Sequence, residues 1–353
     1  MRRRVVLTAG AAAMIPGLGA LAGPQPVSAA ASSRRRIVVA ADGRGDVTTV
    51  QAAVDAVPAG NAAPFRIDVR PGVYHGQVIV PSDKPYIVLR GLGRGPTDVV
   101  VTDDRANGTP KPGGGTWGTS GSASVTLDGA DFTAENLTLS NSFDEAAHPE
   151  ITNRQAVAVL TRADRIAFRG VRFVGNQDTL YVNSQSAATV ARVALDGCYV
   201  EGDVDFIFGR ATAAFTRCHI HSLDRGSDSN NGLVTAASTA ISNPYGLLFD
   251  RCRFTGDAAP GTVFLGRPWH PSNDPDAIGQ TIVRDSVLGA HIKAAPWTDF
   301  GSWPWREARY FEYRSRGPGA GVTDDRPQLI REQAAAYTPA AYLAGADGWR
   351  PFC

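Results

Sequence analysis

The spacing of hydrophobic positions changes twice along the chain. In residues 45–57, four apolar residues share one face of a helix, a threonine can cap its start, and Pro58 follows its end. These apolar residues are Val50, Ala53, Val54 and Val57. Short stretches rich in Val, Ile, Phe and Thr then alternate with Gly, Asn and Asp until helical periodicity returns at residues 327–343. The pattern predicts an all-β chain with a short N-terminal helix and a C-terminal helical tail.

A loosely repeated phrase runs through the β-rich part, as in RGVRFVGN (169–176) and DGCYVEG (196–202). Its aligned positions lie 34, 27, 20 and 34 residues apart, at Leu137, Val171, Cys198, Cys218 and Cys252. Such spacings, the longer ones with insertions, are typical of solenoid turns and predict a parallel β-helix. A β-sandwich of many short strands is the alternative.

The cysteines extend this prediction. Residues one turn apart in a β-helix stack at the spacing of neighbouring strands, which lies within the Cα separation of a disulfide. The turn from Cys198 to Cys218 carries no insertion, so we expect a disulfide between them, while Cys252 and Cys353 can remain free. The sequence has no CxxC motif and no Cys/His cluster, so we expect no metal site.

The N-terminus has the features of an export signal. Three arginines at residues 2–4 precede an apolar stretch, and small residues follow around residue 30. A membrane anchor is disfavoured because Gly and Pro interrupt the stretch before it reaches the ~20 apolar residues of a span. We therefore expect a twin-arginine-like signal in residues 1–30, a single catalytic β-helix domain in residues 31–353, and a secreted protein that does not bind membranes.

Charge and composition narrow the function further. The 353 residues carry a formal net charge of +1 and are 43% hydrophobic, enough for a large core. A balanced charge argues against nucleic acid as a partner. The composition suits a globular enzyme, and we expect a monomer.

A carboxylate in an apolar stretch raises the question of function. In GDVDFIFGR (202–210), Asp203 and Asp205 alternate with apolar residues, and a buried ionised carboxylate needs a partner or a task. Three other stretches, RQAVAV (154–159), GNQDTLYV (175–182) and LGRPW (265–269), also place polar residues among apolar ones. Each has a structural interpretation when taken alone: a surface amide, a turn residue, an ion pair or a partly buried tryptophan.

Together and in this order, the four stretches resemble the signature motifs of the pectin methylesterases, the pectinesterase family of carbohydrate esterases. The resemblance extends from about residue 48 to residue 322. It implies a right-handed parallel β-helix with a shallow cleft, no metal and no organic cofactor. The implied substrate is methyl-esterified polygalacturonate.

The resemblance also implies roles for the polar residues. Asp205 is the expected nucleophile, kept ionised by Arg267, and Asp178 is the acid that protonates methanol and then acts as base toward water. The amides of Gln155 and Gln177 are expected to stabilise the oxyanion. Substrate contacts are expected from Trp269, Tyr181, Phe208, Arg225 and Thr119.

One motif departs from the family pattern, and two other functions stay open. The stretch GVYHG (72–76) has Gly76 where the family has Glu, and residues 270–279 are also atypical. Because no Gly-x-Ser-x-Gly elbow is present, a serine esterase is not expected. The alternatives are a non-catalytic pectin-binding β-helix and a Ca²⁺-dependent pectate lyase on the same fold.

Overall fold

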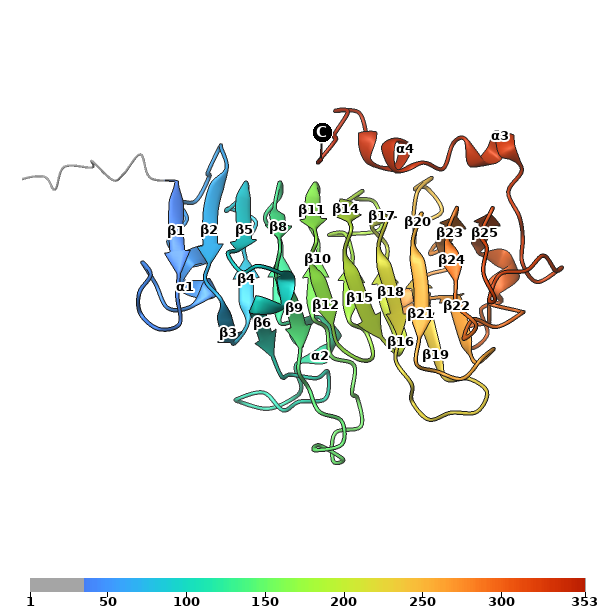
Figure 1. Cartoon of the computed structure of the whole chain (residues 1–353), viewed down its shortest axis with the longest axis horizontal. Coiled ribbons are helices and arrows are strands. Elements are labelled where there is room, and N and C mark those ends of the chain that lie inside the picture. The colour runs from blue at the N-terminus through green and yellow to red at the C-terminus, as the bar shows by residue number, and fades with distance from the viewer. Residues whose placement is uncertain (1–34, 353) are drawn as a thin grey trace, which may run out of the picture. The chain divides into compact units, whose positions relative to one another are not determined.

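The computed structural model describes residues 35–352, and the signal expected in residues 1–30 lies outside them. From Arg35 onward, the described residues form one compact unit. The chain visits three parallel sheets in turn, so that strands adjacent in a sheet belong to successive coils (Figure 1). The prediction of a parallel β-helix is confirmed, and the β-sandwich is excluded.

The strands divide into sheets of ten, eight and seven strands. The ten-stranded sheet contains β1 (Arg36–Val39), β2 (Phe65–Val69), β5 (Ile87–Gly91), β8 (Thr133–Glu135), β11 (Ile166–Arg169), β14 (Arg192–Asp196), β17 (Thr212–Thr216), β20 (Leu247–Asp250), β23 (Gln280–Arg284) and β25 (Arg309–Tyr313). The eight-stranded sheet contains β3 (Gly72–His75), β6 (Val99–Asp103), β9 (Thr138–Asn141), β12 (Arg172–Val174), β15 (Tyr199–Gly202), β18 (His219–Ser222), β21 (Arg253–Gly256) and β24 (Val287–Leu288). The seven-stranded sheet contains β4 (Val78–Val80), β7 (Val125–Leu127), β10 (Val159–Thr161), β13 (Leu180–Val182), β16 (Val204–Gly209), β19 (Gly232–Ala237) and β22 (Val263–Pro268).

Short helices interrupt and follow the strands. The described α-helices are α1 (Val50–Asp55), α2 (Gly118–Gly121), α3 (Arg331–Ala334) and α4 (Pro339–Ala344), and the 3₁₀ turns are η1 (Pro96–Asp98), η2 (Pro271–Asn273) and η3 (Trp305–Glu307). Helix α1 confirms the predicted N-terminal helix: Thr49 accepts a hydrogen bond from the amide of Ala52, and its apolar face is buried. None of the described helices is long and apolar enough to cross a membrane.

The core lies inside the coils, where inward side chains of successive turns stack in register. Phe215 of β17 pairs with Phe249 of β20, and their stacked rings have centroids 4.6 Å apart. Both side chains are fully buried. Burying a side chain of this size stabilises the fold by about 1.5–3 kcal/mol, so the ladders account for much of the stability.

A column of left-handed residues explains the repeated phrase. The residue before each aligned position has a positive φ, where the chain turns from the ten-stranded to the eight-stranded sheet. These residues are Asn136, Gly170, Gly197, Arg217 and Arg251, with φ between 53° and 60°. Glycine and asparagine tolerate this conformation readily, whereas the surrounding coil imposes it on the arginines.

The predicted disulfide is wrong. Cys198, Cys218 and Cys252 are buried free thiols. The residues that follow Cys198 and Cys218, Tyr199 and His219, pair in register, so the two thiols stack as expected. Side chains stacked in a parallel ladder point the same way, so their Cβ atoms stay about a strand spacing apart, beyond the ~3.8 Å that a disulfide prefers.

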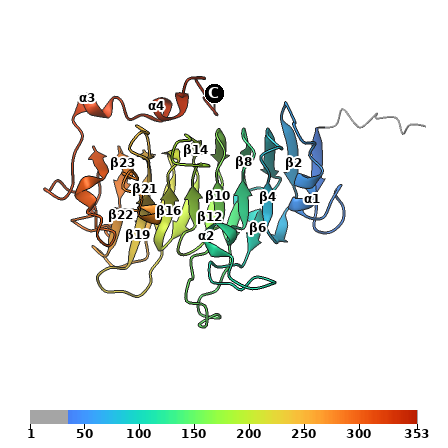
Figure 2. The same ribbon diagram turned by 180° about the vertical axis from the view of Figure 1, so that it is seen from behind.

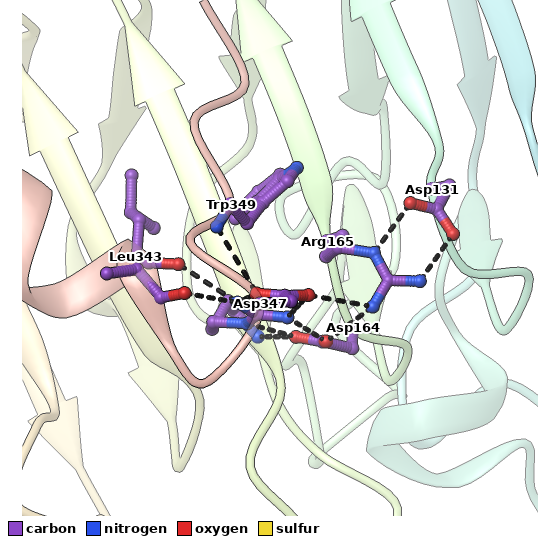
Figure 3. Close-up of polar contacts among 8 residues, drawn as sticks. Asp131, Asp164, Arg165, Leu343, Asp347 and Trp349 are labelled. Atoms are coloured by element: carbon purple, nitrogen blue, oxygen red, sulfur yellow. Dashed lines mark hydrogen bonds and ion pairs between the residues drawn. The ribbon is translucent and has the colours of Figure 1, made fainter.

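The C-terminal tail crosses the outer face of the ten-stranded sheet, where α4 packs against β14 and β17. Arg192 of β14 donates to Asp164 at 2.6 Å, to Asp347 of the tail at 2.5 Å and to the carbonyl of Leu343 at 3.0 Å (Figure 3). The guanidinium also lies 5.5 Å from the ring centroid of Trp349. The predicted C-terminal helical tail is confirmed, and an arginine from the middle of the chain holds it.

Candidate active site

Asp205 lies at an irregularity in the seven-stranded sheet. All residues of β16 are buried, and the register between β16 and β19 shifts between Val204 and Ile207. Asp205 falls inside this shift and has a φ of 48°. Because a bulge re-aims a side chain that would otherwise follow the pleat, Asp205 can line a pocket on the sheet surface although its neighbours are core residues.

Arg267 holds the carboxylate of Asp205. It projects from β22, two strands away, because Phe208 pairs with Ala236 and Ala236 pairs with Arg267. Its Nε donates to Asp205 Oδ1 at 3.0 Å, and its Nη2 donates to Oδ2 at 2.5 Å. This two-pronged contact fixes the carboxylate in orientation as well as in charge.

Asp178 reaches the same pocket from the turn before β13. It has a φ of 68°, and its amide donates to the carbonyl of Val204 at 3.1 Å, which ties the turn to the strand that carries Asp205. Both aspartates are more than nine-tenths buried and line one pocket. Both carboxylates thus belong to non-glycine residues in left-handed backbone, a conformation that the surrounding coils must hold.

The two carboxyls differ in their surroundings. Burial, reinforced by the negative charge of Asp205, raises the pKa of Asp178 well above its usual range. Burial also raises the pKa of Asp205, but the hydrogen bonds and charge of Arg267 oppose that rise. As the pH rises, Asp205 therefore ionises first, and Asp178 keeps its proton to a higher pH.

The two glutamines enter the pocket from neighbouring coils. The amide of Ala156 donates to the carbonyl of Gln177 at 3.1 Å, so the stretches that carry Gln155 and Gln177 run side by side. Both side chains line the pocket. The Oε1 atom of Gln155 is buried and has no hydrogen-bond partner in the part of the chain that the structure describes.

Three aromatic rings form one wall of the pocket. Tyr181 and Phe208 stack with centroids 4.1 Å apart, and Trp269 meets both edgewise at 5.9 and 5.6 Å. Tyr181 and Phe208 are buried, and Trp269 is half-buried. Burial raises the pKa of Tyr181 to about 12, so its hydroxyl stays neutral and can donate. Trp269 is the most accessible face for a ligand.

Helix α2 also contributes to the lining of the pocket. Figure 2 shows this short helix near the lower ends of the central strands. Thr119 lines the pocket together with Ser120, and Asn107 donates to the hydroxyl of Thr119 at 2.9 Å. The volume of the pocket is about 340 Å³. The pocket thus brings together nine of the ten residues that the sequence nominated as catalytic or substrate-binding.

Arg225 is the one that does not line this pocket. It lies in a neighbouring depression, where its Nε is 3.5 Å from Asp203 Oδ2. Asn231 fixes the loop by accepting from the Arg225 amide at 2.7 Å and donating to Asp224 at 2.7 Å. A substrate role for Arg225 thus depends on a ligand that extends beyond the pocket.

Sequence reasoning missed Phe300. This residue lines the pocket, and the guanidinium carbon of Arg267 lies 4.4 Å from its ring centroid. Backbone hydrogen bonds with Trp303 hold its loop. The only signal in the sequence is the aromatic density of residues 297–305, which does not indicate which ring faces the pocket.

Two sequence expectations concern groups that the chain lacks, a metal site and the glutamate of the family's first motif. Among residues 35–352, no group of three or more His, Cys, Asp or Glu side chains is arranged to hold a metal. Gly76, where the family motif has Glu, has a φ of 109°, and a Cβ built there would meet open space. A glutamate there would need either this strained backbone or a different one.

The comparisons with known proteins agree on one family. The family model described as Pectinesterase matches residues 36–346. Pectinesterase 31 of Arabidopsis thaliana is 35% identical over 329 residues, covering 88% of this chain and 93% of the relative. Pectinesterase A of Dickeya chrysanthemi is 35% identical over 334 residues, covering 86% and 87%.

Solved structures give the same result. A pectin methylesterase in complex with a hexasaccharide superposes with a TM-score of 0.80 at 33% identity, covering 90% of this chain and 98% of the other. The carrot pectin methylesterase superposes with a TM-score of 0.74 at 30% identity, covering 88% and 93%.

Proposed function

Since the chain belongs to the pectinesterase family and is thus a carboxylic ester hydrolase, we propose that it removes methyl esters from polygalacturonate with Asp205 as nucleophile and Asp178 as acid and base. The observation that carries this proposal is the pair of buried aspartates in one pocket, only one of which is bound by Arg267. That asymmetry separates their protonation states, as the two roles require.

The first half of the reaction forms a bond to Asp205. An ionised Asp205 oxygen attacks the ester carbonyl carbon, and the carbonyl oxygen becomes an oxyanion. When the intermediate collapses, the bond to the methoxy oxygen breaks and Asp178 gives that oxygen its proton. Methanol leaves, the galacturonate acyl group remains on Asp205, and Asp178 is now ionised.

The second half reverses the proton transfer. Asp178 takes a proton from water as the water oxygen attacks the acyl carbon, and collapse releases Asp205 as a carboxylate. The products are methanol and a uronic acid, which loses its proton to solvent, and both aspartates return to their starting states. Arg267 supports both steps because its two hydrogen bonds stabilise the ionised form of Asp205.

The glutamines are suited to stabilise the oxyanion. Neither the Gln155 nor the Gln177 side-chain amide is hydrogen-bonded to another described residue, so no protein acceptor competes for their N–H groups. A neutral donor stabilises the transient charge without stabilising a charged ground state. Trp269 offers a flat face against which a sugar ring can lie.

We also propose where and in what form the protein acts. Secretion is consistent with a polymer substrate outside the cell, but the twin-arginine signal lies in residues that the structure does not describe. The monomeric state and the domain limits at residues 31–353 also remain predictions. Action without a cofactor follows from the proposed roles, since the aspartates supply both the nucleophile and the proton.

Methanol release from esterified pectin tests the proposal, with Asp205→Asn and Asp203→Asn as a matched pair two residues apart. We expect Asp205→Asn to lower the rate on the order of 10³- to 10⁴-fold, because the amide is a poor nucleophile. Asp203→Asn should keep most of the activity, since Asp203 lines the neighbouring depression instead. Equal losses in the two variants would contradict the assignment.

The same assay separates the alternatives. A non-catalytic binding protein would bind polygalacturonate without releasing methanol. A lyase would instead generate unsaturated product, seen as rising ultraviolet absorbance, and would lose activity in a Ca²⁺ chelator. Methanol release without unsaturated product supports the esterase, whether or not chelator is present.

A further inference from the structure

A second groove lies where the ten-stranded and eight-stranded sheets meet. Its lining comes from β5, β8, β11, β12 and β15 and the turns beside them, whereas the candidate active site is built on the seven-stranded sheet and α2. The groove has a volume of about 720 Å³. It crosses four successive coils and so extends along the axis of the β-helix.

Arginines outnumber carboxylates in the lining of the groove. Glu135 is the one carboxylate among its lining residues. The four arginines that line it are Arg90, Arg94, Arg169 and Arg172. In the strand ladder Glu135 lies between Arg90 and Arg169, yet it makes no ion pair with either. The lining therefore keeps more positive than negative side chains, and Glu135 holds neither arginine in a close ion pair.

The arginines differ in how they are held. The side chains of Arg90 and Arg94 have no hydrogen bond or ion pair with any residue in 35–352. Arg172 lies over the ring of Tyr199, with its guanidinium carbon 4.0 Å from the centroid, and Tyr199 in turn donates to Glu201 at 2.6 Å. Arg172 also lies 3.9 Å from Glu201, and the guanidinium carbon of Arg169 lies 4.6 Å from the ring centroid of Phe352. The groove thus combines two arginines that have no polar side-chain partner among the described residues with a fixed aromatic ring and its stacked arginine.

We propose that this groove is a second binding site for polygalacturonate, engaging a stretch of polymer whose esters have already been removed. Guanidinium groups match carboxylates in geometry, and the fixed Tyr199 ring offers an apolar surface beside them. Because Arg90 and Arg169 lie two strand spacings apart, their backbones are about 9–10 Å apart, which lets one chain along the axis meet both. The proposal rests on the proposed function, since the esterase makes the uronates that this groove recognises.

A second contact on the same polymer would act through effective concentration. A long chain held at the groove keeps its unhydrolysed esters near the active site without changing the chemistry there. The groove should therefore lower the KM for long pectin, leave kcat unchanged, and have no effect on oligomers too short to span both sites. Added salt should remove the advantage because it screens the exposed arginines.

The test compares two double variants that remove the same charge. Arg90→Ala with Arg94→Ala alters the groove, and Arg44→Ala with Arg331→Ala removes two exposed arginines that line neither the groove nor the pocket. Calorimetric titration of the full chain with de-esterified polygalacturonate should show roughly tenfold weaker binding for the groove variant at low salt, and near wild-type binding for the control. The groove variant should also show a raised KM on long pectin alone.

Two outcomes would overturn the proposal. Equal binding by wild type and groove variant would show that the arginines do not contact the polymer. Equal weakening in both double variants would show that only net charge matters. Because the titration needs no catalysis, it also decides the question if the wild type releases no methanol, which would refute the proposed function separately.

Discussion

Two clusters in this molecule are built from aspartate and arginine, but the side chains serve different purposes in each. In the tail cluster, Arg192 bridges Asp164 and Asp347, and Arg165 binds Asp131 with two short hydrogen bonds (Figure 3). In the candidate active site, a single arginine, Arg267, binds only one of two aspartates in the pocket. The first cluster joins chain segments, whereas the second separates two protonation states.

The aspartates of the two clusters differ in protonation because they differ in burial and in whether an arginine donates hydrogen bonds to them. The side chain of Asp347 is 46% exposed, and the hydrogen bond from Arg192 lowers its pKa, so it stays ionised. Asp178 is almost completely buried and has no such donor, so its pKa rises. An aspartate near an arginine is therefore a structural ion or a catalytic acid according to its solvation and its share of that arginine.

The largest effect on kcat is expected from replacing the arginine of each cluster, Arg267 or Arg192, in separate variants. We expect Arg267→Gln to lower kcat about 10²- to 10³-fold, because Asp205 loses its charge partner and competes with Asp178 for the proton. Arg192→Gln should leave kcat near wild type, since it lies in the tail cluster. Methanol-release kinetics on both purified variants provide the measurement, and a large kcat loss in Arg192→Gln would contradict the division of roles.

A loss of similar or smaller size is expected when a neutral donor is removed from the pocket. Gln177→Ala should lower kcat by about 10²-fold and change KM little, because the amide acts on the oxyanion rather than on bound substrate. Gln333→Ala, in α3, is the matched control. If Gln177→Ala raised only KM, the amide would serve binding instead.

The raised pKa of Asp178 predicts an effect on stability with a defined sign. Between the unfolded pKa of about 3.9 and the higher folded pKa, the native state holds a proton that the unfolded state has lost, so stability falls as pH rises. Asp178→Asn removes that penalty and should melt higher than wild type at neutral pH, with a difference that shrinks near pH 3.5. Calorimetry at several pH values measures this, and a pH-independent difference would argue against a protonated Asp178.

The activity profile should show the complementary dependence. The rate should rise with pH as Asp205 ionises and fall again as Asp178 loses its proton, with two apparent pKa values that belong to the pair. A rate that stays constant from acid to alkaline pH would be inconsistent with this assignment.

The tail cluster predicts a change in stability without a change in mechanism. In Arg192→Gln, the loss of charge-assisted hydrogen bonds should lower the melting temperature by roughly 2–5 °C. Differential scanning calorimetry measures this shift. An unchanged melting temperature would mean that α4 is held by its apolar contacts alone.

The smallest effect concerns the thiol ladder. Burial raises the pKa of Cys198 and Cys218 well above the usual range, so both should resist alkylation in the folded protein. Mass spectrometry after labelling should find Cys198, Cys218 and Cys252 modified only in denaturant. Protection that persists in denaturant without reductant would indicate a disulfide after all.

The fold could be predicted from the sequence because each coil of a β-helix repeats the same turn residue and the same apolar position. Gly170 and Gly197 indicate left-handed turns, and the apolar residues that follow them stack at the same position of successive coils. Arg217 and Arg251 occupy the same conformation, which no local preference predicts. The disulfide prediction failed because chain spacing gives the distance between stacked cysteines but not the direction of their side chains.

The candidate site was predicted through motifs rather than through physical patterns. Propensity flags Asp205 as unusual, but its bulge and its bond to Arg267, 62 residues away, follow from the register of three strands. Phe300 escaped prediction because its loop is placed by backbone bonds to Trp303. Likewise, nothing near Arg192 in the sequence indicates a partner in the tail.

The protonation of Asp178 at neutral pH is the central claim, and infrared difference spectroscopy tests it most directly. Wild type minus Asp178→Asn, recorded at pH 7, should contain the C=O stretch of one buried protonated carboxyl, and that band should disappear at high pH as the rate falls. A difference spectrum with only ionised carboxylate bands at pH 7 would show that both aspartates are charged and would contradict the mechanism.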